Sequence, residues 1–150
     1  AINYFDAVVN LFTSFGYFSS TRDNVRMLDS VATSLKSNGF FLLDYFNSSK
    51  VRRMVADCSE GSRIVDKTNF AWKKSIVDQA VVKKIEVVED GIVYNFSERV
   101  QLFSLQDFQK MLSEKFDIIN VFGDYGLANF DESSSDRMIF LCRKKVYKVC

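Results

Sequence analysis

The sequence predicts an α/β fold in which an open parallel sheet carries a separate antiparallel insert. The segments 5–12 and 40–46 are short, apolar on both faces and rich in β-forming residues, which is typical of buried parallel strands. Residues with helical spacing connect them, so the three segments form a βαβ unit, whose crossover is right-handed. Segment 63–103 instead alternates polar and apolar residues, as antiparallel strands do when one face is packed. A chain of 150 residues can bury one core, so we expect a single domain, 1–150, with the insert at 63–103.

The helix between the two parallel strands is expected to begin at Ser20 or Thr21 and to stop at Asn38-Gly39. A hydroxyl oxygen at the start of a helix accepts a hydrogen bond from a free amide of the first turn, and Asp23 favours the positive end of the same turn. Asn and Gly tolerate the left-handed conformation that ends a helix. The predicted buried stripe consists of Val25, Leu28, Val31, Ala32 and Leu35.

A second helix is expected directly after strand 40–46, capped by Asn47 or Ser48 and closed by segment 60–62. One of its faces carries Val51, Met54, Val55 and Cys58.

The insert is predicted to hold three or four antiparallel strands. Asp90-Gly91 is a strong hairpin signal, because both residues accept the positive φ that tight turns need. Side-chain alternation puts Ile92, Tyr94 and Phe96 on one face of the last strand. The expected strands are 63–70, 72–79, 80–88 and 92–103.

The remainder of the chain predicts one more helix and two more strands. Ser104-x-x-Asp107 resembles a capping box and opens the helix. Strands are expected at 118–122 and 138–142, joined by a loop at 123–136.

Composition excludes several classes of function. A net charge of +1 provides no field that would attract nucleic acid or an acidic membrane. Histidine is absent, which excludes histidine-based catalysis within this chain and most kinds of metal site, so no metal is expected. No apolar run approaches the length of a membrane span, and no signal peptide is recognisable. Three cysteines, Cys58, Cys142 and Cys150, have no paired spacing, which favours a reducing compartment and a cytoplasmic protein.

Basic residues occur in adjacent pairs that are scattered among acidic residues. We interpret these pairs as solvated faces, with phosphate binding as the less favoured alternative. The pairs are Arg52-Arg53, Lys73-Lys74, Lys83-Lys84 and Lys144-Lys145.

The order of elements resembles the second half of a class I S-adenosylmethionine-dependent methyltransferase. In that family the fourth strand reads F-D-x-V, as Phe5-Asp6-Ala7-Val8 does here, and a helix then leads to L-K-P-G-G before the fifth strand. Here Leu35-Lys36-Ser37-Asn38-Gly39 stands at that place, with Ser-Asn-Gly in the position of P-G-G. Segment 122–140 resembles the terminal hairpin of the fold, and the insert resembles that of small-molecule members, including aminosugar N-methyltransferases, where it forms a lid or a dimer surface.

The resemblance implies a partial Rossmann-like fold with strands four to seven, S-adenosylmethionine as the cofactor and a small-molecule acceptor. The six glycines form no G-x-G pattern, so the family's cofactor loop is not in this sequence. We therefore expect the carboxyl-terminal part of a longer enzyme, inactive alone. Its first strand would have a bare edge, which predicts a homodimer or a strand-swapped oligomer.

Two other classes of function stay open at this point. The first is a non-enzymatic α/β module that oligomerises through the insert sheet or the open strand edge. The second is another nucleotide-binding Rossmann-like protein, which is less favoured because the sequence has no phosphate loop.

The resemblance places the site at the carboxyl ends of the parallel strands, where ligands bind in open α/β sheets. Asn10, Leu11 and Phe12 are expected to bind the cofactor, although strand packing explains Leu11 and Phe12 equally well. Tyr17 and Asp44 are the candidate catalytic residues; a helix cap or surface carboxylate is the alternative for Asp44. The candidate substrate-binding residues are Ser14, Phe15, Tyr17, Tyr45, Arg99, Asp124, Tyr125 and Arg137.

Three of these assignments have structural alternatives. Arg137 is able to bind a carboxylate or phosphate of the substrate, or simply to contact an aspartate at the surface. Arg99 either roofs the pocket or pairs with an acidic residue of the insert, such as Glu98. The loop around Phe15 is either a wall for the acceptor or a surface loop with packed aromatic residues.

Overall fold

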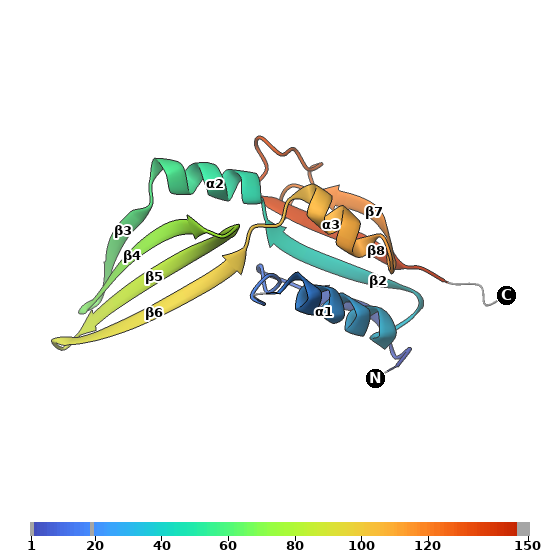
Figure 1. Cartoon of the computed structure of the whole chain (residues 1–150), viewed down its shortest axis with the longest axis horizontal. Coiled ribbons are helices and arrows are strands. Elements are labelled where there is room, and N and C mark those ends of the chain that lie inside the picture. The colour runs from blue at the N-terminus through green and yellow to red at the C-terminus, as the bar shows by residue number, and fades with distance from the viewer. Residues whose placement is uncertain (1, 19, 147–150) are drawn as a thin grey trace.

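The computed structural model describes residues 2–18 and 20–146, which form two four-stranded sheets and three helices (Figure 1). Sheet A has the strand order β1-β2-β8-β7, and sheet B has the order β3-β4-β5-β6. The predicted α/β class with an antiparallel insert is confirmed. Along the chain the elements are β1 (Phe5–Asn10), α1 (Thr21–Ser34), β2 (Leu35–Phe46), α2 (Ser48–Asp57), β3 (Glu60–Val65), β4 (Thr68–Val77), β5 (Ala80–Glu89), β6 (Ile92–Gln101), α3 (Leu105–Leu112), β7 (Phe116–Phe122) and β8 (Arg137–Lys144).

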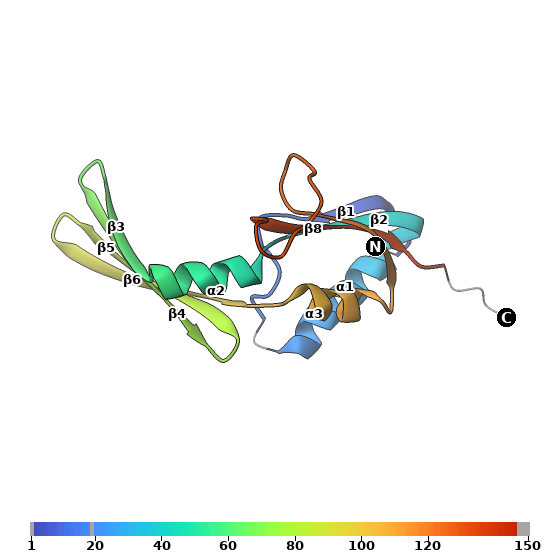
Figure 2. The ribbon, with the colours of Figure 1, turned by 90° about the horizontal axis from the view of Figure 1, so that it is seen from above.

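Sheet A forms the main body with two helices on one of its faces. β1 and β2 pair in parallel, as predicted, while β8 pairs antiparallel with both β2 and β7. Figure 2 shows α1 and α3 on the same side of this sheet. Between the helices and the sheet lies the core, in which Phe41, Phe108 and Phe140 are fully buried. Apolar burial of this kind is the main favourable term in folding.

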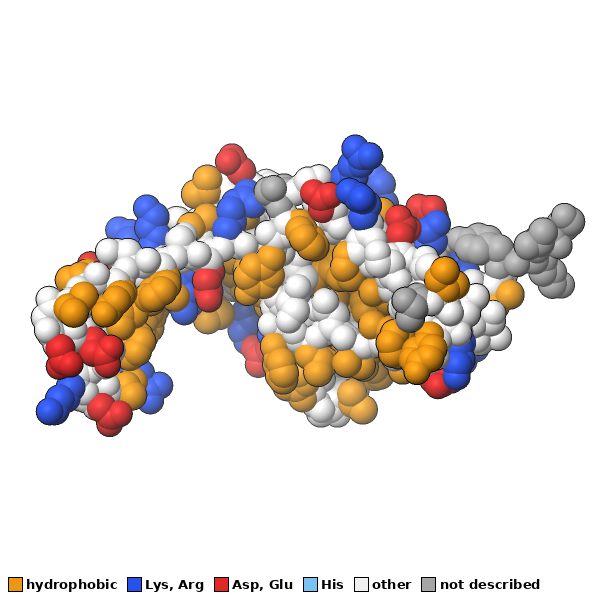
Figure 3. Space-filling model, turned by 90° about the horizontal axis from the view of Figure 1, so that it is seen from below, with side chains coloured by type: hydrophobic (Ala, Val, Ile, Leu, Met, Phe, Trp, Pro, Cys, Tyr) orange, Lys and Arg blue, Asp and Glu red, His pale blue; other side chains and the backbone are white. Residues whose placement is uncertain are grey.

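The other face of sheet A has no helix over it among the described residues. Val9 lies opposite Leu42 in the register, one position away from the core residue Phe41, so its side chain points to this bare face. Val9 is 60% exposed. The prediction that segment 5–12 is buried on both faces is therefore wrong for β1, which also pairs on one side only. In Figure 3, hydrophobic side chains gather along the lower edge of the main body, the side away from α1 and α3.

Helix α1 begins as predicted but ends earlier. The hydroxyl of Ser20 accepts a hydrogen bond from the Arg22 amide, which makes Ser20 the cap. The helix stops at Ser34, before the predicted Asn38-Gly39. These two residues instead lie in a bulge of β2: φ of Asn38 is +62°, and a Cβ on Gly39 would lie 3.1 Å from the Asp6 carbonyl oxygen. Asn38 and Gly39 do form irregular backbone, as predicted. Instead of ending a helix, they allow the backbone of β2 to approach β1 closely.

Sheet B begins earlier than predicted and has two turns that were not predicted. Asn47 caps α2 as expected, whereas segment 60–62, predicted to close that helix, belongs to β3. The turn at Asp90-Gly91 is confirmed. Two further tight turns, at 66–67 and 78–79, were missed because they place Asp66 and Asp78 at positive φ and contain no glycine.

Hydrogen bonds and apolar packing attach sheet B to the main body, where Val100 belongs to the core cluster. The Gln101 amide donates to the Gly16 carbonyl at 2.9 Å, the Arg52 guanidinium donates to the Gln79 side chain at 2.6 Å, and the Tyr45 hydroxyl donates to the Gln101 carbonyl. Gly16 has φ +90°, and a Cβ there would lie 3.3 Å from the Tyr45 oxygen, so only glycine fits this crossing without strain.

The last third of the chain follows the prediction closely. Ser104 and Asp107 form the capping box of α3, with hydrogen bonds in both directions. Strands β7 and β8 extend the predicted 118–122 and 138–142 by a few residues each. Of the described helices, none has the length and apolar character needed to cross a bilayer. The cysteine at 150 lies outside the described residues.

Candidate functional site

The carboxyl ends of β1 and β2 meet at one rim of sheet A. Asn10, the last residue of β1, lies opposite Leu43, and the Thr13 amide donates to the Asp44 carbonyl at 3.1 Å. Tyr125, which follows Asp124 in the loop between β7 and β8, also reaches Asp44. Asn10, Asp44 and Asp124 therefore lie at the same end of the sheet, as the strand order predicted.

Asp44 is the centre of a buried hydrogen-bond network at this rim. Its side chain is 1% exposed. Oδ2 accepts hydrogen bonds from the Phe12 amide at 2.8 Å and from the Tyr125 hydroxyl at 3.0 Å. Oδ1 accepts from Arg137 Nε at 2.8 Å and lies 2.7 Å from Arg137 Nη2. A buried carboxylate needs this much compensation for its lost hydration.

Arg137 uses two of its three nitrogens for contacts within the protein. Besides Asp44, it donates from Nη2 to the Thr13 hydroxyl at 3.0 Å, and its guanidinium lies 5.8 Å from the centre of the Tyr125 ring. The alternative contact with an aspartate is present, but it is a buried ion pair and not a surface contact. The predicted binding of a substrate group by Arg137 stays a prediction. Partial burial and the hydrogen bond to Asp44 raise the pKa of Tyr125, since a phenolate would face that carboxylate.

The network holds two residues in an unfavourable backbone conformation. Phe12 has φ +56° and Thr13 has φ +59°, a region that residues with a Cβ, and β-branched residues above all, rarely occupy. The Asp44 side chain and carbonyl accept the amide hydrogen bonds of these two residues. Strain of this kind persists only where surrounding contacts support it, and it is concentrated at functional sites. Asp44 therefore shapes the segment that follows β1.

A cleft of about 230 Å³ opens beside this segment, between sheet A and sheet B. Thr13, Tyr17 and Phe46 line it from the rim. α2 contributes an apolar wall, and sheet B contributes both apolar and charged residues. The residues from these two parts are Val51, Met54, Val55, Lys74, Val81, Lys83, Glu98 and Val100. An apolar pocket with a few polar groups at a sheet rim is the usual form of a small-molecule site.

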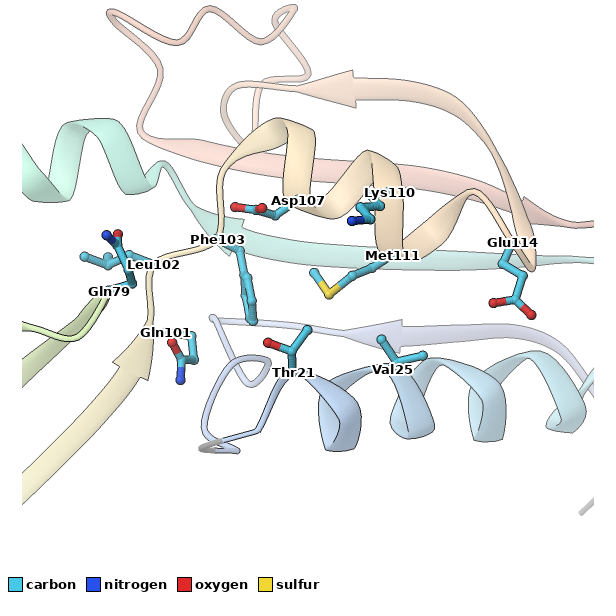
Figure 4. A pocket seen from close by; sticks show the side chains of 10 residues that line it. All are labelled: Thr21, Val25, Gln79, Gln101, Leu102, Phe103, Asp107, Lys110, Met111 and Glu114. Atoms are coloured by element: carbon cyan, nitrogen blue, oxygen red, sulfur yellow. The ribbon is translucent and has the colours of Figure 1, made fainter.

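A second and larger hollow, of about 540 Å³, lies between α1 and α3 (Figure 4). Phe103 and Met111 reach into it from the α3 side, and Val25 faces them from α1. Asp107 lines this hollow at the start of α3, and its carboxylate already accepts hydrogen bonds from Ser104 in the capping box. This hollow is a trough between two helices. Its lining residue Gln79 also has a positive φ, but among the described residues the hollow has no buried ion pair like that of Asp44 and Arg137.

The structure brings Tyr17 to the cleft but not all of its predicted neighbours. Phe15 and Tyr45 are fully buried and pack in the core against Phe108, so their side chains do not face an acceptor. Burial also raises the pKa of the Tyr45 phenol. The sequence marked both as site residues because aromatic side chains suit a pocket and a core equally well.

Arg99 lies on the wrong face of sheet B for the cleft. It pairs in register with Val82, whereas the cleft is lined by the alternate residues Glu98 and Val100. Because neighbouring side chains of a strand point to opposite faces, Arg99 points away. Among the described residues it also makes no ion pair with Glu98, the alternative considered from the sequence.

Ser14 and Asp124 stabilise local turns at the rim. The Ser14 hydroxyl donates to the Leu11 carbonyl at 2.6 Å. Asp124 Oδ1 accepts from the Ala128 amide at 3.1 Å. Both side chains are exposed, so their predicted contacts with a substrate stay predictions.

The end of β1 fits part of S-adenosylmethionine, the cofactor that the resemblance implies. Asn10 Oδ1 is buried and accepts no hydrogen bond from the described residues, which leaves an acceptor that an ammonium donor would satisfy. Leu11 and Phe12 follow with exposed apolar side chains, Phe12 at 76%. An acceptor followed by apolar surface suits the ammonium and the uncharged parts of this molecule.

Sequence reasoning missed Thr13 and the apolar face of α2 as parts of the site. Thr13 carries no signal of its own, because its positive φ and its contact with Arg137 arise from residues far along the chain. The stripe of Val51, Met54 and Val55 was recognised as one helix face. A signal was available there, since a helix that follows a parallel strand begins at the rim where ligands bind.

The chain shares its fold with S-adenosylmethionine-dependent methyltransferases. No family model and no curated protein match it. A solved methyltransferase of this class from Clostridium acetobutylicum superposes with a TM-score of 0.82 at 18% identity, over 94% of this chain and 58% of that one. A methyltransferase from Streptomyces caelestis gives 0.76 at 16% identity, over 95% and 62%. A sugar N-methyltransferase from Streptoalloteichus gives 0.70 at 15% identity, over 96% and 57%. The resemblance to this fold is confirmed, and the chain spans little more than half the length of these proteins.

Proposed function

We propose that this chain forms the acceptor side of a cytoplasmic, S-adenosylmethionine-dependent methyltransferase that acts on a small molecule. The observation that carries the proposal is the position of the cleft. It opens at the carboxyl ends of β1 and β2, beside the strained segment at Phe12 and Thr13, in a chain with a methyltransferase fold. Ligands of open α/β sheets bind at this rim.

S-adenosylmethionine, when bound, supplies a methyl group on a sulfonium for direct displacement by the acceptor. The protein has to position the acceptor and exclude water. In this proposal Asn10 accepts a hydrogen bond from the cofactor's ammonium, while Leu11 and Phe12 contact its uncharged parts. The apolar wall of α2 excludes water from the cleft.

Tyr17 is the proposed catalytic residue, because its side chain lines the cleft from the rim. Its hydroxyl would orient the acceptor by a hydrogen bond. Asp44 was the second candidate. Its carboxylate is already engaged on both oxygens, so we propose that it acts as a positioning residue that holds Phe12 and Thr13 in place.

Exchange of Tyr17 for phenylalanine tests the catalytic assignment in the complete protein. Removal of this hydroxyl should lower kcat for methyl transfer about tenfold or more, with little change in stability because the side chain is exposed. Tyr94→Phe is the matched control, since Tyr94 is also exposed but lies on sheet B outside the cleft. Equal activity of the two variants would reject Tyr17.

Asn10 provides a test in which binding and stability move in opposite directions. Asn10→Leu removes a buried acceptor that has no donor among the described residues, so we expect the free energy of unfolding to stay the same or to rise. In the complete protein the same variant should bind S-adenosylmethionine at least about tenfold more weakly, because a hydrogen bond to a charged group is lost. A clear loss of stability with unchanged affinity would mean that Asn10 is structural.

We further propose that the residues supplying the cofactor's main grip lie outside this chain. The chain covers 58% of the length of the methyltransferase from Clostridium acetobutylicum, and its sequence has no G-x-G loop. This segment alone should therefore bind S-adenosylmethionine weakly and be inactive. Isothermal titration that shows micromolar binding to residues 1–150 alone would contradict the proposal.

The exposed side of β1 supports a proposal about assembly. Val9 and Phe5 are exposed on a strand that has a partner on one side only among the described residues. Unpaired strand edges with apolar side chains associate readily. We propose that another segment or a second copy covers this edge, as a homodimer or a strand-swapped oligomer. Sedimentation of residues 1–150 as a stable monomer with rapid amide exchange along β1 would reject it.

A non-enzymatic module that oligomerises is the rival function. Its support is the same open edge together with the exposed apolar side chains of sheet B, such as Ile92 and Phe96. The Tyr17→Phe experiment separates the two, because a module without catalysis shows no methyl transfer to lose.

A further inference from the structure

Three charged side chains form a row across sheet B on the face that lines the cleft. Lys74 of β4 lies directly opposite Lys83 of β5, and Lys83 lies directly opposite Glu98 of β6. All three line the cleft. Like charges directly opposite each other on neighbouring strands destabilise a sheet, so the pair of lysines is not explained by folding.

The ammonium groups in this row have no carboxylate within ion-pair distance in the described part of the chain. Among the described residues, Lys74, Lys83 and Glu98 form no ion pair, and Lys83 instead lies 5.8 Å from the centre of the Trp72 ring. Lysines elsewhere in the chain do pair with carboxylates, as Lys36 does with Asp6 at 2.8 Å. The row therefore keeps two positive charges and one negative charge directed at the cleft.

The adjacent residues on the same strands provide a natural comparison. Lys73 and Lys84 are also directly opposite each other, but the alternation of side chains puts them on the far face of sheet B. Lys73 there lies 3.8 Å from Glu60. The pairs Lys73-Lys74 and Lys83-Lys84 thus each send one lysine toward the cleft and one away from it.

The rest of the cleft is apolar on the side of α2. Val51, Met54 and Val55 face the lysines across it, with Phe46 at the rim. In the view from below, a hollow separates the lobe of sheet B from the main body, with basic, acidic and hydrophobic side chains along it (Figure 3). A ligand that satisfies both walls has an apolar body and an anionic group.

We propose that Lys74 and Lys83 form an anion-binding subsite of this cleft, which holds a carboxylate or phosphate group of the acceptor. Two ammonium groups on adjacent strands provide several donors to the oxygens of one anion, and the anion relieves their mutual repulsion. That the bound molecule is a methyl acceptor rests on the function proposed above. The subsite itself rests on the row of charges and on the walls of the cleft.

The test is a titration of the chain with inorganic phosphate and, separately, with acetate at low ionic strength. Two-dimensional NMR would follow the backbone amides and the lysine side chains. We expect saturable shifts at Lys74, Lys83 and the residues of the α2 wall. Tighter binding of phosphate than of acetate assigns the subsite to phosphate esters, and the reverse order assigns it to carboxylates.

Two double variants make the test specific. Lys74→Met with Lys83→Met should weaken the anion affinity about tenfold or more, because hydrogen bonds between charged groups are lost. Lys73→Met with Lys84→Met removes the same charge from the same strands on the other face, and it should change the affinity less than about twofold. Thermal unfolding would check that both double variants fold. If the first double variant does not fold, the single variant Lys83→Met replaces it in the titration.

Three results would overturn the subsite: no saturable shifts in the chain, shifts away from the cleft, or equal weakening by the two double variants. None of them touches the proposed methyl transfer, which the Tyr17→Phe experiment tests independently. A complete enzyme that methylates neutral acceptors only, with unchanged kinetics in the Lys74 and Lys83 variants, would also reject the subsite while the proposed function stands.

Discussion

Sheet A and sheet B have equal numbers of strands but differ in what keeps them ordered. Sheet A places Phe41, Leu43 and Phe140 in a core under two helices, all fully buried. In sheet B, Ala80 and Val100 are the buried residues among the described strand positions, and Phe96 is 56% exposed. Sheet B is therefore held by its hydrogen-bond ladder and by its attachment to the rim. The well-buried sheet A and the less buried sheet B meet at the cleft.

Core substitutions should break this comparison most strongly. Phe140→Ala in sheet A should lower the free energy of unfolding by about 3–5 kcal/mol, through lost apolar contacts and a cavity. Phe96→Ala in sheet B should cost less than about 1 kcal/mol, since its ring is more than half exposed. Urea unfolding of both variants measures the difference. Similar losses would mean that sheet B is buried against a partner in solution.

The ion pairs of the two sheets also differ in how much they contribute to the free energy of unfolding. Asp44→Asn leaves Arg137, whose side chain is only 20% exposed, without its counter-charge, so we expect a loss of about 3 kcal/mol. Glu60→Gln breaks the pair with Lys73, whose side chains are 72% and 70% exposed, and should cost at most about 0.5 kcal/mol.

A double-mutant cycle sharpens this result. Asp44→Leu together with Arg137→Met should be less destabilising than the sum of the two single changes, because neither charge is left buried alone. Additive losses would show that the two side chains act independently.

Alkaline pH should act on sheet A through Cys142, which is buried between β2 and β7. Burial raises the pKa of this thiol from 9.0 to about 12. Below about pH 9 the thiol is protonated in both the folded and the unfolded chain, and its full contribution to the stability of the fold is present. Between these pKa values only the unfolded chain loses the proton, so the free energy of unfolding should fall by about 1.4 kcal/mol per pH unit.

Unfolding of Cys142→Ala measured from pH 8 to pH 11 checks this dependence. The variant should show a shallower fall than the parent chain from about pH 9 upward throughout this range, because Tyr45 acts equally in both proteins. Burial raises the pKa of that phenol too, so a second loss follows above its ordinary value of 10.0. Identical slopes for parent and variant would contradict the role of the thiol.

The smallest expected effect concerns the like-charged pair on the far face of sheet B. Lys84→Glu places a carboxylate directly opposite Lys73 and should raise stability by about 0.2–1 kcal/mol. Lys84→Gln, which only removes the repulsion, should give a smaller gain. A loss of stability in both variants would mean that Lys84 has a partner in solution.

Much of the fold followed from local patterns. The strands at Phe5 and Phe40, the caps at Ser20 and Asn47 and the box at Ser104 were all predicted, because each depends on residues within a few positions of one another. The turns at positions 66 and 78 escaped prediction, since aspartate takes the left-handed conformation there without a neighbouring glycine.

The site was predictable in outline but not in detail. The common rim follows from the parallel order of β1 and β2, which any βαβ unit shares. The pair of Asp44 and Arg137 joins residues far apart in the chain, and no local pattern marks either as the partner of the other. For Phe15 and Tyr45, the same aromatic character suits a core and a pocket, so only their burial distinguishes the two.

By itself, the sequence determined which segments form strands and helices and where the parallel strands end, because spacing and caps act over a few residues. The tertiary structure decided which side chains face the cleft and which point away from it. The alternation of side chains along a strand puts Lys74 and Lys73 on opposite faces of sheet B, and likewise Lys83 and Lys84. It does not say which face is covered. That depends on where α2 and the rim of sheet A lie, and the packing of distant segments alone determines their place.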